Sequence, residues 1–280
     1  MREILDSLLV CPDSLVDVRR VEGGYANEST GAFYPVAEGI PVMRRGPLRL
    51  KESVWGEEAA DPEHFIWLRC QDELHMPEFV LGALGRMILE IVNRVTPRLG
   101  LTLDIDTGTG RLVRSLLESR ALKSFVVATD VSPHVLLGLI RSMKDDGSRV
   151  PAAVAVNPVR LPFRSAVFDT AMSLAGFSNI PSGRTALGEA ARVLKPGGML
   201  IFAHLMLLDP SGKGVAIAED RGLGDLIDLA RLDMALRTFD MRIVDLREYS
   251  HGRWPENASN VVPASGDLFS LVLIEARKEQ

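Results

Sequence analysis

The stretch at residues 103–110 constrains the fold more than any other part of this sequence. β-Prone apolar residues lead into it, a glycine-containing turn closes it, and residues 111–119 then repeat apolar side chains at helical spacing. Gly108 and Gly110 allow a sharp turn and a close approach of a ligand to the backbone, because glycine has no Cβ. The N-terminus of the following helix offers free N–H groups to such a ligand. The stretch therefore predicts a strand, a binding turn and a helix.

A second acidic residue stands at the end of the next predicted strand, residues 125–129. Asp130 follows Gly110 by 20 residues, the distance at which a carboxylate can bind the hydroxyl groups of a ribose. A nicotinamide dinucleotide site needs a third glycine for the pyrophosphate, whereas this turn opens with an acid. The pattern favours a nucleoside ligand without a pyrophosphate.

The same stretch resembles the first motif of the class I S-adenosylmethionine-dependent methyltransferases, in which a strand leads into Asp-x-Gly-x-Gly-x-Gly. Asp104, Gly108 and Gly110 match this motif, and Asp106 stands where the family has its first glycine. The resemblance implies S-adenosylmethionine as the cofactor, with the turn around its methionine portion and Asp130 on its ribose.

Two further segments resemble that family. Residues 157–169 are similar to its Asp-x-x-x-Leu-Pro-Phe-x-x-x-x-Phe-Asp segment, with Asn157 in place of the acid that meets the adenine amino group. An amide oxygen can still accept that hydrogen bond. Residues 189–198 match the Glu-x-x-Arg-Val-Leu-Lys-Pro-Gly-Gly run, which implies a helix end, a turn and a fifth strand. The cofactor contacts implied by the resemblance are Asp104, Asp106, Thr107, Gly108, Gly110, Asp130, Val131, Asn157, Pro158, Leu174 and Ala175.

The resemblance implies an α/β domain over residues 99–280, with a Rossmann-like seven-stranded sheet and helices on both faces. Ligands of open parallel sheets bind beyond the carboxyl ends of the strands, so the segment after the fourth strand should face the transferred methyl group. Ser132 and Ser182 are predicted to cap helices. Residues 209–224, which are rich in glycine and charge, are predicted to form a loop or lid.

Residues 1–46 resemble a small zinc-ribbon module that begins Leu-x-Cys-Pro-x-Cys and ends Tyr-Pro-Ile-x-x-Gly-Ile-Pro-Val. Zinc needs four thiolate or imidazole ligands, whereas the matching positions hold Cys11, Ser14, Asn27 and Thr30. We interpret the segment as a degenerate ribbon that has kept its strands and lost its zinc, and we expect no metal. An unrelated N-terminal hairpin is the alternative.

Residues 47–98 are predicted to form a helical cap or linker. Apolar residues recur there at helical steps until Pro97 stops the pattern. Two interpretations remain open for His64, Trp67 and His75: they line a pocket on the substrate side, or they pack these helices together.

Composition excludes several classes of protein. A content of 46% hydrophobic and 25% charged residues is that of an ordinary globular protein, and no apolar run approaches the ~20 residues of a membrane span. The N-terminus does not resemble a signal peptide, and two cysteines cannot form a disulfide framework, so we expect a cytoplasmic protein. A net charge of −5 gives no general attraction to nucleic acid. We expect a small-molecule partner, and neither nucleic acid nor a membrane.

The leading hypothesis is methyl transfer to a small-molecule acceptor. His204, at the end of the fifth strand, is the candidate general base, although a structural role in the core is an equal alternative; Tyr249 and His251 are weaker candidates. A non-catalytic binding or regulatory protein is the second hypothesis, because Asp106, Asn157 and the missing zinc ligands depart from the families. An RNA methyltransferase is the third, because fusions of zinc ribbons with methyltransferases include ribosomal RNA enzymes.

Overall fold

The computed structural model describes residues 2–44, 76–256 and 262–279. A seven-stranded sheet forms the centre, in the order β10-β11-β9-β8-β5-β6-β7. The strands from β9 to β7 are parallel, and β11 and β10 are added antiparallel at one edge. The seven strands are β5 (Gly100–Ile105), β6 (Ser124–Asp130), β7 (Ala152–Ala155), β8 (Phe168–Leu174), β9 (Leu194–Leu207), β10 (Met241–Arg253) and β11 (Leu268–Lys278).

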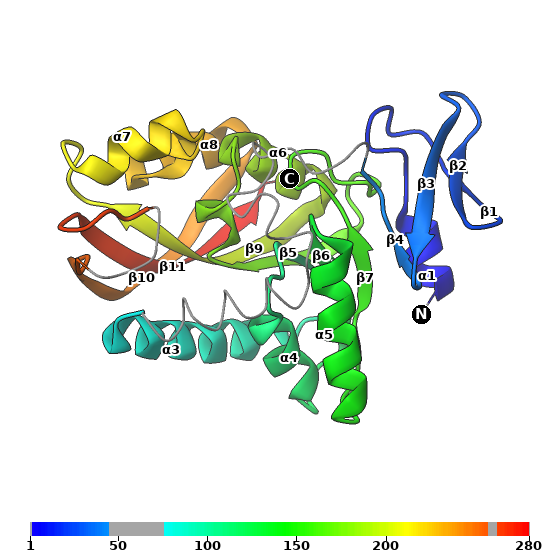
Figure 1. Ribbon diagram of the computed structural model, residues 1–280, viewed down its shortest axis with the longest axis horizontal. Helices are drawn as coiled ribbons and strands as arrows, with labels where there is room; N and C mark the ends of the chain where they lie inside the picture. The colour runs from blue at the N-terminus through cyan, green and yellow to red at the C-terminus, as the bar shows by residue number, and fades with distance from the viewer. Residues whose placement is uncertain (1, 45–75, 257–261, 280) are drawn as a thin grey trace.

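Helices cover both faces of this sheet (Figure 1). On one face lie α3 (Glu78–Val95), α4 (Arg111–Glu118) and α5 (Pro133–Asp145); on the other lie α6 (Gly183–Val193) and α8 (Leu229–Thr238). Side chains alternate along each strand, so Val126 and Ala128 pack with α3–α5 while Val127 joins the core of the opposite face. The expected seven-stranded α/β sheet is confirmed.

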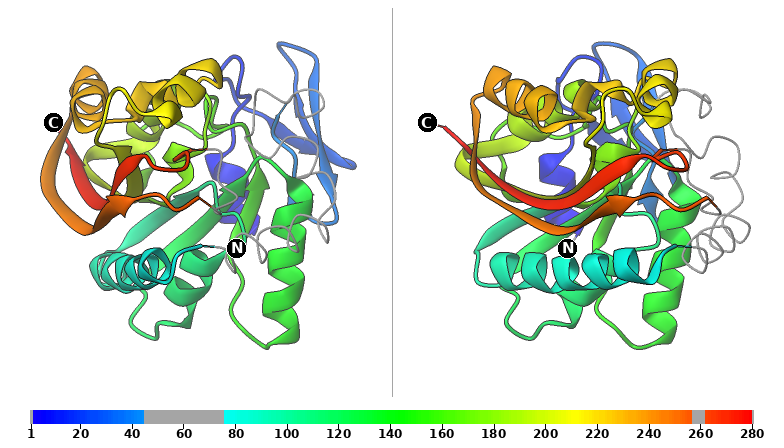
Figure 2. Two further views of the ribbon diagram at one scale, coloured as in Figure 1. Left: turned by 60° about the vertical axis from the view of Figure 1, so that its left-hand side comes forward. Right: turned by 90° about the vertical axis from the view of Figure 1, so that its left-hand side faces the viewer.

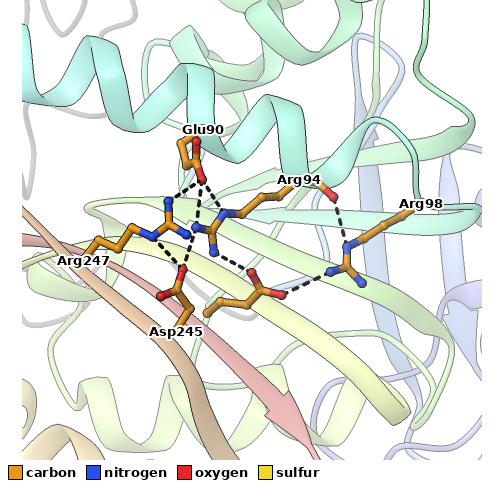
Figure 3. A network of polar contacts seen from close by, with 6 residues as sticks. Glu90, Arg94, Arg98, Asp245 and Arg247 are labelled. Carbon is orange, nitrogen blue, oxygen red and sulfur yellow. Dashed lines mark hydrogen bonds and ion pairs between the residues drawn. The ribbon is translucent and has the colours of Figure 1, made fainter.

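Helix α3 is fixed to the antiparallel edge by a network of ion pairs (Figure 3). The guanidinium of Arg94 donates to Glu275 and Asp245 at 2.6 Å and to Glu90 at 2.8 Å. The Arg94 side chain is only 14% exposed, and its bonds hold the pKa of Asp245 below the ordinary range. Because several charges share one partly buried site, the network is stronger than isolated surface pairs. It holds the C-terminal end of α3 against β10 and β11.

The N-terminal segment forms a separate small sheet beside β7 (Figures 1 and 2). Its strands pair antiparallel in sequence order. The segment also contacts the connection between β7 and β8. Leu9 bridges Phe163 there, and the Val10 N–H donates to Pro162 O. The elements are α1 (Arg2–Leu8), β1 (Arg19–Val21), β2 (Gly24–Asn27), β3 (Ala32–Ala37) and β4 (Ile40–Pro41).

A buried asparagine links the turns of this small sheet. The Asn27 side chain donates to Asp17 O at 3.0 Å and to Val16 O at 3.4 Å. Its Oδ1 accepts from Ser29 Oγ and from both N and Oγ1 of Thr30. Within the described residues, no group of three or more His, Cys, Asp or Glu side chains could hold a metal ion. The side-chain amide of Asn27 thus joins the turns of this small sheet.

Two local expectations are wrong. Residues 209–224 hold a helix, α7 (Lys213–Asp220), rather than an open loop. Its glycines serve close packing: Asp267 Oδ2 accepts from the Gly214 N–H at 2.9 Å, and a Cβ on Gly214 would lie 2.0 Å from that oxygen. Ser182 precedes α6 without capping it by its side chain, because its φ of 61° is left-handed; its backbone carbonyl accepts from Thr185 and Ala186 instead.

The structure describes only part of residues 47–98, which were predicted to be helical. Helix α3 confirms the pattern that Pro97 stops. His64, Trp67 and His75 lie outside the described residues. In the described part of the chain, no helix combines the length and the apolar character that crossing a membrane requires.

Candidate functional site

The parallel strands end together at one edge of the sheet, and most residues singled out from the sequence lie there. β5 ends at Ile105, β6 at Asp130, β7 at Ala155 and β8 at Leu174. Short connections follow each strand, and these carry the predicted cofactor contacts. This is the edge at which open parallel sheets bind ligands.

The glycines of the first turn have different functions. Gly110 has a φ of 80° and precedes α4, and a Cβ there would lie 2.3 Å from Leu139 Cδ1 on α5. Gly108 has a φ of 54°, and a Cβ there would meet nothing within 4 Å. Gly110 therefore serves the packing of α4 against α5. Gly108 leaves open space beside the backbone, as a close-lying ligand requires.

Asp130 connects the ends of two strands. Its Oδ2 accepts from the Gly108 N–H at 3.0 Å, and its Oδ1 accepts from the Ser132 N–H at 2.9 Å. The side chain is 5% exposed at the end of β6. A carboxylate oxygen has two lone pairs and can accept more than one hydrogen bond.

Asp104 is buried next to this carboxylate. The pKa of Asp104 is raised to about 7, mainly by burial and also by the charge of Asp130, while a hydrogen bond from Thr107 opposes the shift. Thr107 Oγ1 donates to Asp104 Oδ2 at 2.6 Å and accepts from the Thr129 N–H. The edge thus holds two close carboxyl groups, which suits a ligand that carries a positive charge.

Asp106 occupies a backbone conformation that favours glycine. Its φ is 59°, in the left-handed region. Gly176 makes room for it from the turn after β8, where an added Cβ would lie 2.7 Å from the Cβ of Asp106. Ser173 supports the same contact, because its hydroxyl donates to Ile105 O at 2.7 Å. Asp106 thus adopts a backbone conformation that glycine adopts readily.

The segment after β7 carries Asn157 and Pro158. Asn157 Oδ1 accepts from the Val159 N–H at 3.1 Å, and the Val156 N–H donates to Asp130 O at 2.8 Å. This segment is tied to the adjacent end of β6, where Val131 follows Asp130. The predicted adenine contacts thus lie next to the predicted ribose contact.

The two later sequence motifs contact each other. Arg192 on α6 donates to the carbonyl oxygens of Leu161 and Phe163, and Glu189 accepts from the Leu161 N–H at 2.7 Å. Arg192 also pairs with Glu189. The Glu-x-x-Arg pair therefore fixes the Leu-Pro-Phe segment and, through it, the position of Asn157.

Leu174 and Ala175 form the end of β8, opposite the first turn. Ala175 has a φ of 62°, and its N–H donates to Ala203 O on β9. Both residues are partly exposed.

The contacts of His204 indicate a structural role. The residue is 1% exposed, its Nε2 lies 2.7 Å from Leu226 O, and its Nδ1 lies 3.1 Å from Ser178 Oγ. A carbonyl oxygen only accepts, so Nε2 carries the proton and Nδ1 accepts from the serine hydroxyl. Burial lowers the pKa of His204 to about 4. Both nitrogens are engaged, which favours the structural alternative over proton abstraction.

Tyr249 and His251 lie on β10, the outer strand of the antiparallel edge. His251 is exposed, and its Nδ1 lies 2.8 Å from Glu248 Oε1. The Tyr249 carbonyl accepts from Arg86 on α3. The structure does not bring either residue into the connections that follow β5, β6 and β7.

Two connections at this edge were missed by sequence reasoning. Thr129 Oγ1 donates to the backbone oxygen of Asp104 at 2.7 Å and so couples β6 to β5. Arg44, from the N-terminal segment, donates through Nε to Val131 O at 2.9 Å. A threonine before the strand-end acid gave a weak local indication of the first, and no local pattern indicated the second.

Comparison with known proteins agrees with this geometry. Residues 103–202 match a family model described as a methyltransferase domain. Over these residues the chain is similar to the methyltransferase domain family. The class I resemblance expected from the sequence motifs is confirmed for the domain.

Individual relatives cover less than the whole chain. A ubiquinone/menaquinone biosynthesis C-methyltransferase, UbiE, of Bordetella parapertussis is 37% identical over 111 residues, which are 39% of this chain and 43% of that protein. An O-methyltransferase of Pyrenophora dematioidea is 29% identical over 189 residues, 64% of this chain and 69% of that protein. The chain therefore spans less than half the length of the UbiE relative.

Solved structures share the fold. A Haemonchus contortus N-methyltransferase, in complex with phosphomonomethylethanolamine and S-adenosylhomocysteine, superposes with a TM-score of 0.55. It is 15% identical, and the match covers 70% of this chain and 53% of that one. At this identity the likeness shows the architecture of the methyltransferase domain.

Proposed function

We propose that the chain is an S-adenosylmethionine-dependent methyltransferase. The observation that carries the proposal is the pairing of Gly108 with Asp130: the backbone beside open space donates to the carboxylate that ends the next strand. A carboxylate that suits ribose hydroxyls thus lies next to a turn with open space, and this supports the proposal. The family match of residues 103–202 supports this assignment.

The residues present suit each part of that cofactor. Asp130 would accept from ribose hydroxyls, Val131 and Asn157 would hold the adenine, and the turn from Asp104 to Gly108 would hold the methionine end. The positive charge of the ammonium group would favour the ionised form of Asp104, whose pKa is otherwise raised to about 7. When bound, the cofactor supplies a methyl group activated by its sulfonium, so the protein has to orient donor and acceptor and exclude water.

We infer a small-molecule acceptor with an aromatic or quinone-type ring. The UbiE relative takes its name from ubiquinone and menaquinone biosynthesis. In this chain, Phe79 and Phe269 stack at 6.1 Å, and Trp254 meets Phe269 edge-on at 5.1 Å. Phe269 pairs with Leu207, beyond the end of β8, so these rings lie toward the binding edge. Phe269 and Trp254 are buried, whereas Phe79 is 48% exposed, so of these three rings Phe79 is the one that could face a planar apolar ligand.

Calorimetric titration with S-adenosylhomocysteine tests the cofactor assignment. We expect binding by the wild type and at least a tenfold weaker affinity for Asp130→Ala, because charge-assisted hydrogen bonds contribute about 1.5–3 kcal/mol. Glu248→Ala, which removes an exposed acid on β10, is the matched control and should bind like the wild type. Absence of binding in the wild type would support the non-catalytic alternative.

The acceptor is tested separately. The chain is incubated with methyl-labelled S-adenosylmethionine and a reduced 1,4-naphthoquinone, and the product is analysed by mass spectrometry. Transfer of one methyl group to the ring is expected. Cofactor binding without transfer to this probe would retain the methyltransferase proposal and reject the quinone-type acceptor. Transfer to bulk RNA under the same conditions would favour the RNA alternative.

A further inference from the structure

The N-terminal segment extends beyond its own small sheet and joins the edge of the large one. Val42 forms a parallel bridge with Ala155 on β7, and the Met43 N–H donates to Ala155 O at 2.8 Å. Figure 1 shows β4 beside β7. Because the bridge is parallel, the chain that follows β4 runs in the same direction as β7. It therefore arrives at the carboxyl edge of the sheet, where the candidate site lies.

Arg44 is the next residue along this path. Its Nε donates to the Val131 carbonyl at 2.9 Å, across 87 positions of the sequence. Val131 lies between Asp130 and Ser132, and the Ser132 N–H donates to Asp130 Oδ1. Arg44 thus holds the central carbonyl of the short turn that orients the Asp130 carboxylate.

Charge supports the same placement. The pKa of Asp104 is raised, partly by the Asp130 carboxylate beside it. A guanidinium is protonated at any physiological pH, and that of Arg44 lies against the residue that follows Asp130. The geometry thus brings a positive charge to the residue next to the acid that ends β6.

We propose that Arg44 is a positioning residue for the nucleoside end of the cofactor. It fixes the turn at residues 130–132 in the conformation in which Asp130 faces the ribose and Val131 faces the adenine. The inference rests on the proposed function. It makes the N-terminal segment a contributor to the methyltransferase domain's binding site rather than an independent module.

The test compares two probes on the full chain. S-adenosylhomocysteine contains both ends of the cofactor, and adenosine contains only the nucleoside end. We expect Arg44→Ala to weaken the binding of both by about tenfold, the size of one lost charge-assisted hydrogen bond. Arg44→Lys, which keeps the charge and a donor, should restore most of the affinity. Arg44→Gln keeps a donor without the charge and should lie between them.

Arg141→Ala is the matched control. It removes the ion pair between Arg141 and Glu38, which joins the N-terminal segment to α5. Both side chains are 61% exposed. We expect this variant to bind both probes like the wild type. An equal loss of affinity in Arg141→Ala would overturn the proposal, because the effect would then be general loosening of the junction.

Other outcomes separate this inference from the proposed function. Unchanged affinity in Arg44→Ala, while Asp130→Ala binds weakly, overturns the role of Arg44 and leaves the proposed function intact. Loss of S-adenosylhomocysteine binding with unchanged adenosine binding also overturns it, since the effect would lie at the methionine end. No binding by the wild type overturns both. Should Arg44→Ala fail to fold, the comparison of Arg44→Lys with Arg44→Gln decides, and equal affinities there reject the role of the charge.

Discussion

The N-terminal sheet and the turn at residues 104–110 each lack residues that the families they resemble carry, and the structure accommodates the two losses in different ways. In the N-terminal sheet, Asn27 makes hydrogen bonds to four residues of the adjoining turns. In the binding turn, Asp106 adopts the left-handed conformation of the missing glycine. In the first region the hydrogen bonds of a side-chain amide join the turns, and in the second an acidic residue adopts a conformation that favours glycine.

The difference follows from what each region has to do. A metal that joins two turns supplies a cross-link, and a buried side chain with enough hydrogen bonds can supply one too. A binding turn has to present particular backbone atoms to a ligand, so its path cannot change. In this chain the turn has room for the Cβ of Asp106 because the neighbouring residue, Gly176, has no Cβ of its own. Structural functions are exchanged more readily than binding functions.

The largest expected effect tests the cross-link in the N-terminal sheet. Asn27→Ala should lower the free energy of unfolding by about 3 kcal/mol, because it leaves several buried partners without hydrogen bonds. Urea denaturation measures the change. Ser29→Ala removes only one of these bonds, from an exposed residue, and should cost less than about 1 kcal/mol. Equal small losses in both variants would show that Asn27 does not replace a cross-link.

The next largest effect tests whether the pH dependence of the free energy of unfolding originates in His204 and Asp104. The pKa of His204 is lowered from 6.5 to about 4, so its contribution to stability is lost as the pH falls through this window. The pKa of Asp104 is raised from 3.8 to about 7, so its contribution is lost as the pH rises through the overlapping window. In the wild type the two slopes oppose each other.

Variants separate these slopes. With His204→Gln, stability should fall by about 1.4 kcal/mol per pH unit relative to the wild type as the pH rises from about 4.5 to 6. With Asp104→Asn the relative slope should have the opposite sign. Urea denaturation at several pH values measures both. Parallel pH curves for the two variants and the wild type would place the titrating groups elsewhere.

Local sequence patterns were sufficient to predict much of the backbone at the binding edge of the sheet. The apolar runs, Gly108, Gly110 and Asp130 define a strand, a turn and the next strand within some 30 residues, so their arrangement follows from local patterns. The packing of Asp267 against Gly214 joins positions 53 residues apart. Glycine in that segment therefore indicated a loop to sequence reasoning, whereas in the structure it permits a close contact.

The contacts of single side chains were harder to predict. His204 was predicted to end the fifth strand, a position typical of a catalytic base, whereas it lies within β9. Only the fold shows that Leu226 O and Ser178 Oγ engage both of its nitrogens. In the sequence Arg44 is one of several basic residues at positions 44–51, and its partner Val131 is 87 positions away. Periodicity and spacing report on backbone structure, whereas these roles depend on which distant atoms meet.

A smaller effect is expected from restoring the glycine of the binding turn. Asp106→Gly relieves the left-handed strain and removes a negative charge near the methionine end. Two charges about 4 Å apart interact by about 4 kcal/mol at an effective dielectric constant of ~20, but Asp106 is partly exposed, so solvent reduces the effect. We expect the variant to bind S-adenosylhomocysteine about three- to tenfold more tightly, by calorimetry.

A loss of affinity for S-adenosylhomocysteine in Asp106→Gly would contradict this prediction. Weaker binding by Asp106→Gly would show that the carboxylate grips the ammonium group of the ligand. Asp106→Asn separates the two causes, because it keeps the backbone strain and removes the charge. Equal gains in Asp106→Gly and Asp106→Asn would assign the whole effect to charge.

The smallest expected effect is that of a chelator on the N-terminal sheet. Structural zinc contributes about 10–16 kcal/mol in zinc-finger peptides at neutral pH, so its removal by 1,10-phenanthroline would lower the melting temperature visibly. Cys11 offers a single thiol, whose Sγ lies 3.2 Å from Tyr34 Oη, and one thiolate cannot hold a structural zinc site. We expect an unchanged melting temperature and no stoichiometric zinc by elemental analysis. One zinc per chain, together with a chelator-sensitive melting temperature, would mean that the hydrogen bonds of Asn27 accompany a metal rather than replace it. The contrast between the two regions would then disappear, because each would retain the essential part of the family it resembles.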